Sequence, residues 1–93
     1  MTSDYVPIDC DQHSVLELLA LRRTPVVARF RGDDGTPRFT AGDVIDVRTR
    51  NGAEYLVLLD PEGGERSIRL DCLSGLSGTN GEPIWRQKTV IHD

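Results

Sequence analysis

The 93-residue sequence has five aromatic residues, two cysteines and no long apolar run. No stretch approaches the roughly 18 apolar residues that a membrane-spanning helix needs, so no membrane segment is expected. The first residues lack the basic and apolar regions of a secretory signal, so we expect a cytoplasmic protein. Because the cytosol is reducing, Cys10 and Cys72 are expected to be free, buried thiols.

The groups that catalysis and metal binding require are also scarce. His13 and His92 lie near opposite ends of the chain. Cys10-x-x-His13 resembles half of a metal site, but no second pair of Cys and His completes a tetrahedral set. The sequence contains neither a Gly-x-Ser-x-Gly nucleophile elbow nor a glycine-rich phosphate loop that opens a helix. We therefore expect no enzyme, no metal and no cofactor.

The net charge of −4 is confined to one part of the chain. Residues 1–21 contain four acids and no base, whereas the remaining residues contain eleven of each. Such an asymmetry is an argument about partners, because an acidic segment on a neutral body is attracted to a basic surface. The same acids also complement the positive end of a helix dipole, so each of them can equally serve the fold.

One helix is predicted near the N-terminus. Residues 14–21 are strong helix formers, and Pro25 prevents continuation of the helix. Asp11 can cap the first turn, and a later start at the capping box of Ser14 and Glu17 is also open. We expect one stripe at helical spacing to cover the core, formed by Val15, Leu18, Leu19 and the stem of Arg22.

After Pro25 the sequence predicts short antiparallel strands. Alternation and turn signals place them at residues 26–31, 36–48, 54–59, 66–70 and 73–76. Gly35 and Asn51-Gly52 are hairpin signals, and Gly42 inside the second strand predicts a bend or a bulge. The nearly continuous apolar run at residues 54–59 is typical of a central strand.

One helix followed by about five strands predicts a mainly β fold, a small and partly open antiparallel barrel. We expect an N-terminal arm at residues 1–8, the barrel with its helix at residues 9–77 and a tail at residues 78–93. Residues 84–85 and 90–91 of that tail can add an edge strand.

Several motifs resemble the Rof family, the Rho-binding antiterminators of bacteria. The segment Tyr-Val-Pro-Ile-Asp-Cys-Asp at residues 5–11 and the segment Glu-Arg-Ser-Ile-Arg-Leu-Asp at residues 65–71 carry most of the resemblance. Residues 16–18 and 54–57 agree as well, in the same order and at nearly the same spacing. Where the family pattern has an aromatic residue and an acid, this chain has His13 and Ser14.

The resemblance implies an Sm-like barrel with an N-terminal helix. It also implies binding to the transcription termination factor Rho, at the OB-fold surface that forms its primary RNA-binding site. Occupying that surface blocks RNA loading and reduces Rho-dependent termination. A monomer is expected, and the expected partner-binding residues are Asp9, Asp11, His13, Ser14, Glu17, Arg50 and Asn51.

Two alternatives stay open. An Sm-like RNA-binding module could use the strand arginines Arg29, Arg31, Arg48, Arg50, Arg66 and Arg69. RNA binding is not expected, however, because the pI is about 5.0 and acids such as Asp43, Asp46 and Glu54 should neutralise the arginines. The resemblance could also mark the fold alone, with the acidic segment binding another basic protein.

Overall fold

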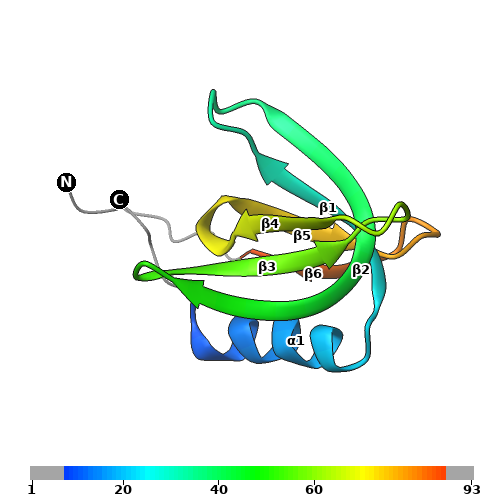
Figure 1. The fold of residues 1–93 in the computed structure, drawn as a ribbon, viewed down its shortest axis with the longest axis horizontal. Helices are drawn as coiled ribbons and strands as arrows, with labels where there is room; N and C mark the ends of the chain where they lie inside the picture. Colours follow the sequence, from blue (N-terminus) through cyan, green and yellow to red (C-terminus); the bar gives the residue numbers. More distant parts are fainter. Residues whose placement is uncertain (1–7, 88–93) are drawn as a thin grey trace.

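A computed structural model describes residues 8–87 (Figure 1). The elements are α1 Cys10–Leu21, β1 Pro25–Arg31, β2 Pro37–Arg50, β3 Ala53–Leu59, β4 Glu65–Arg69, the short 3₁₀ helix η1 Leu70–Cys72, β5 Leu73–Ser77 and β6 Pro83–Arg86. All six strands form one sheet in the order β4-β3-β2-β1-β5-β6, and every neighbouring pair is antiparallel. The predicted mainly β fold, a partly open barrel with one helix, is confirmed.

The long strand β2 lets a single sheet curve round its own core (Figure 1). Its first part pairs with β1 and its second part with β3, and Asp43 takes part in both ladders. A side chain at Gly42 would place its Cβ 2.7 Å from the carbonyl oxygen of Leu59, so the close approach of β3 requires a glycine there. The register shift that accompanies the bend lies slightly further on, between Val44 and Asp46.

The core draws on the helix, the 3₁₀ helix and all six strands. On β1, Val26 and Ala28 are buried while Arg29 and Arg31 are exposed, as the alternation predicts. The buried core residues are Leu16, Val26, Ala28, Val44, Leu56, Leu58, Ile68, Leu70, Leu73, Leu76 and Trp85.

Helix α1 begins earlier than predicted. Its N-cap is Asp9, whose Oδ1 accepts a hydrogen bond from the backbone N–H of Gln12 at 2.9 Å. The prediction that Asp11 caps the helix is therefore wrong, as is the alternative start at Ser14. Ile8 packs against the core just before the cap, which fixes the point at which the chain enters the helix.

The predicted core-facing stripe is correct only at Leu19, which is half-buried against the core. Val15 and Leu18 are 41% and 43% exposed, and Arg22 is exposed as well. Leu16, which the prediction left out, is the fully buried residue of the helix. The helix is therefore rotated relative to the prediction.

Two hydrogen bonds between α1 and β6 accompany this rotation. The indole N–H of Trp85 donates to the carbonyl oxygen of Gln12 at 3.1 Å. The side-chain amide of Gln12 donates in turn to the carbonyl oxygen of Arg86 at 2.6 Å. Because α1 has apolar residues on nearly every side, its sequence alone is compatible with several rotations. The contact with a strand distant in sequence selects the one that buries Leu16.

The hairpin predictions are confirmed by the backbone. Gly35 has a φ of +83°, and Asn51 and Gly52 have φ values of +51° and +79°, as the two central residues of a type I′ turn require. The prediction of residues 54–59 as the central strand is wrong, since β3 lies next to the edge strand β4. Its continuous apolar run reflects burial within the sheet, where Leu56, Val57 and Leu58 are all buried.

Other expectations concern the cysteines and the tail. Both cysteines are free, but Cys10 is exposed, contrary to prediction, because it lies in the first turn of α1 on the solvent side. Strand β6 provides the edge strand expected at residues 84–85, whereas residues 90–91 lie outside the described part of the chain. Within residues 8–87, no helix is both long enough and apolar enough to cross a membrane.

Replacing Leu16 with alanine should destabilise the protein strongly, because the side chain is fully buried. We expect a loss of about 2–5 kcal/mol in the free energy of unfolding, measured by urea denaturation. The matched control, Leu18→Ala on the exposed side of the same helix, should cost about 1 kcal/mol or less. Equal losses in the two variants would contradict this rotation of α1.

Candidate protein-binding surface

The start of α1 and the β2–β3 hairpin lie at the same end of the molecule (Figure 1). Five of the residues predicted to bind a partner, Asp9, Asp11, His13, Ser14 and Glu17, come from the N-cap and first two turns of α1. The other two, Arg50 and Asn51, come from the end of β2 and the hairpin turn.

His13 connects the helix to the hairpin. Its Nε2 lies 2.8 Å from Oε2 of Glu54, and its Nδ1 lies 3.6 Å from Oε1 of Glu17. Glu54 is the second residue of β3 and pairs with Thr49 across the hairpin. The ring of His13 is therefore only 22% exposed, while the side chain of Glu17 is 61% exposed. Glu17 presents its carboxylate to solvent more fully than His13 presents its ring.

Glu54 was not predicted as part of this surface. Its expected role was to neutralise strand arginines, but its carboxylate lies against His13. The sequence contains no local signal for this contact, because 41 positions separate the two residues and the sheet curvature brings them together. The structure thus adds one more acid beside the start of α1.

The solvent-facing side of α1 combines acidic and aliphatic groups. We define the outer helix face as the exposed residues that recur at helical spacing: Asp11, Ser14, Val15, Leu18 and Leu21. Leu21 is 81% exposed, and Val15 and Leu18 are each exposed by more than two fifths. Neighbouring aliphatic groups left in water beside acids are typical of a surface that a partner covers.

Arg50 and Asn51, the two predicted partner-binding residues of the β2–β3 hairpin, differ in their roles. Asn51 adopts the left-handed conformation that the turn requires. The turn alone therefore explains why an asparagine stands at this position, without a role in binding. Arg50 ends β2 opposite Ala53 and is exposed. We define the acidic surface as Asp9, Asp11, Glu17 and Glu54. The hairpin reaches the helix through Glu54 and His13, so Arg50, at the end of β2, lies at the same end of the molecule as this surface (Figure 1).

Two of the six strand arginines, Arg48 and Arg69, form ion pairs with acids. Arg48 Nε lies 2.8 Å from Asp46 and its Nη1 lies 3.0 Å from Glu65, and these hydrogen bonds raise the pKa of the guanidinium. Arg69 donates to both carboxylate oxygens of Asp71, at 2.7 and 2.8 Å, which raises the pKa of Arg69 in the same way. Asp71 is thus the ion-pair partner of Arg69.

The surface offers groups that are suited to binding a partner. Asp11 and Glu17 carry exposed carboxylates on a convex helix, next to aliphatic groups that offer contact area. Across residues 8–87, no three His, Cys, Asp or Glu side chains are grouped so as to hold a metal ion. The expectation that the protein is not an enzyme stays a prediction.

No protein-family model matches the chain, and no curated protein matches it.

Proposed function

We propose that this protein is a cytoplasmic antiterminator that binds Rho at its primary RNA-binding site and prevents RNA from loading. The single observation that carries the proposal is the solvent-facing start of α1, where the exposed carboxylates of Asp11 and Glu17 lie beside the aliphatic side chains of the outer helix face. The Rof-like motifs at residues 5–11 and 65–71 support the same partner.

The chemistry of the two surfaces is complementary. An OB-fold surface that grips single-stranded RNA offers basic groups for phosphates and apolar rings for bases. Asp11 and Glu17 can take the place of phosphates, and Val15, Leu18 and Leu21 can cover the apolar groups. Because the protein's negative charge is concentrated in residues 1–21, electrostatic attraction should accelerate the encounter and salt should weaken it.

The departures from the family pattern affect this surface in different ways. Ser14 is exposed on the outer helix face and removes one negative charge from it. His13 lies between Glu17 and Glu54, so in this chain its main role is to position the carboxylates of those two acids. Glu17 is therefore the residue whose charge the proposal most depends on.

Titration of the protein into Rho bound to a labelled cytosine-rich RNA should release the RNA. The reason is that protein and RNA compete for one surface, so the midpoint should rise linearly with RNA concentration. Fluorescence anisotropy of the labelled RNA measures the release. RNA that stays bound at low salt and saturating protein would refute the proposed function.

Reversal of one charge, Glu17→Lys, should weaken this competition by about tenfold or more, equivalent to about 1.4 kcal/mol. Its melting temperature should stay nearly unchanged, because the side chain is 61% exposed. The control is Glu82→Lys, an identical change of charge in the exposed β5–β6 turn, away from the start of α1 (Figure 1). Equal weakening by both variants would assign the effect to overall charge and contradict a site on α1.

A further inference from the structure

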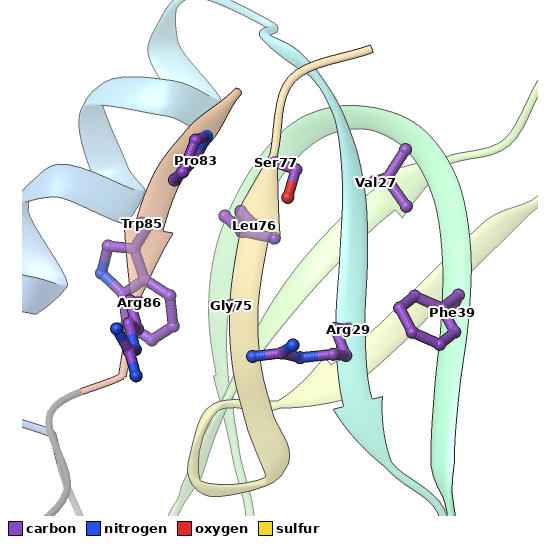
Figure 2. Close-up of a pocket in the computed structure, with 9 residues that line it drawn as sticks. All are labelled: Val27, Arg29, Phe39, Gly75, Leu76, Ser77, Pro83, Trp85 and Arg86. Carbon is purple, nitrogen blue, oxygen red and sulfur yellow. The ribbon is translucent and has the colours of Figure 1, made fainter. Parts of the chain in front are cut away.

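The outer face of the sheet carries a second surface of opposite charge. Four residues lie in one row across β6, β5, β1 and β2, and they are Arg86, Gly75, Arg29 and Phe39. They line a pocket of about 340 Å³, within the range of small-molecule sites, together with Val27, Leu76, Ser77, Pro83 and Trp85 (Figure 2). We call it the sheet pocket. None of its residues belongs to the outer helix face.

The two guanidinium groups of the sheet pocket are available to a ligand. Arg29 and Arg86 are exposed, and no carboxylate within residues 8–87 lies within 4.0 Å of either. They differ in this from Arg48 and Arg69, which are held by acids. The neighbouring row, formed by Val27, Ala41, Ser77 and Pro83, contains no acid either.

The guanidinium of Arg29 reaches across β5 at Gly75. A Cβ at Gly75 would lie 3.9 Å from Nη2 of Arg29, an ordinary van der Waals contact, so the guanidinium lies beside this position. Figure 2 shows the Arg29 side chain directed over Gly75 toward the strand that carries Arg86. Because Arg86 lines the same pocket, positive charges from two strands border one space.

Phe39 provides an aromatic surface beside these charges. It pairs with Arg29 across β1 and β2 and is 67% exposed, the only aromatic side chain within residues 8–87 that is mainly exposed. The ring of Trp85 lines the same pocket but is almost fully buried, and its N–H is engaged by Gln12. Phe39 is thus the ring on which a planar group can stack.

We propose that the sheet pocket binds a free nucleotide, with its base stacked on Phe39 and its phosphate held by Arg29 and Arg86. Guanidinium groups bind phosphate oxygens through paired N–H donors, and aromatic rings stack on any base. One exposed ring, and two guanidinium groups with no carboxylate partner among residues 8–87, match one base and one phosphate. The net charge of −4 opposes a long nucleic-acid chain, which favours a single nucleotide over RNA.

The test uses the single tryptophan of the chain as its reporter. Because Trp85 lines the pocket, titration with adenosine monophosphate should change its fluorescence in a saturable way, and calorimetry should give the same dissociation constant. Adenosine and inorganic phosphate should each bind more weakly than the nucleotide. The absence of saturable binding at millimolar nucleotide would overturn the proposal.

Substitutions assign the binding to this pocket. Phe39→Ala and Arg29→Gln should each weaken binding of adenosine monophosphate by about tenfold. Arg66→Gln, which removes another exposed arginine from β4, should leave the binding unchanged, as should Glu17→Lys. The melting temperatures should stay close to that of the unaltered protein because all four side chains are exposed. Binding unaffected by both pocket substitutions would overturn the assignment.

Two competitors test the choice of ligand. A single-stranded oligoadenylate and an acidic peptide should each displace the nucleotide only at higher concentration than unlabelled adenosine monophosphate. If the oligonucleotide binds more tightly than the nucleotide, the ligand of the pocket is RNA and the proposal is overturned. If the peptide binds more tightly, the ligand is a protein and the proposal is likewise overturned. Loss of nucleotide binding leaves the Rho proposal unaffected, because Rho competition is measured on a different surface.

Discussion

The arrangement of the molecule depends on the contact between α1 and β6. The indole N–H of Trp85 donates to the carbonyl oxygen of Gln12, and the side-chain amide of Gln12 donates to the carbonyl oxygen of Arg86. The indole ring is at the same time part of the core. An N–H donor on a buried ring needs an acceptor, and the Gln12 carbonyl supplies it. With this contact in place, Leu16 is buried, and Val15, Leu18 and Leu21 are left in water. The exposed surface of the helix is therefore a consequence of how a distant strand binds it.

Charge is distributed over the fold by pairing as much as by composition. Arg48 on β2 and Arg69 on β4 are held by acids, and Glu54 on β3 lies against His13. On the outer face of β1 and β6, Arg29 and Arg86 have no such acid among the described residues. A nearly neutral body can thus display an acidic helix and a basic pocket on separate surfaces, although its pI of about 5.0 suggests only an acidic protein.

The parts of the fold that follow from local chemistry were predictable from the sequence. Asn51-Gly52 demands left-handed backbone, and the alternation at residues 26–31 places one set of side chains inside. The rotation of α1 was not predictable, because its apolar residues surround the helix and a distant strand selects the buried side. Likewise, the distribution of charge along the sequence predicts that the start of α1 is acidic. It does not predict that Glu54 joins this surface or that Arg29 pairs with Phe39, because both contacts depend on how the strands pair.

The contact between α1 and β6 also bears on the order in which the protein is assembled. The chain is synthesised from its N-terminus, so α1 emerges first, and its hydrogen-bond partner Trp85 follows 73 residues later. Contacts over such separations form late in folding, since a long loop must close before they are gained. Until β6 is made, the helix lacks the contact that distinguishes its inner from its outer side. The acidic surface therefore becomes defined only once β6 has been made, so a chain on the ribosome that lacks β6 would not yet present it to a partner.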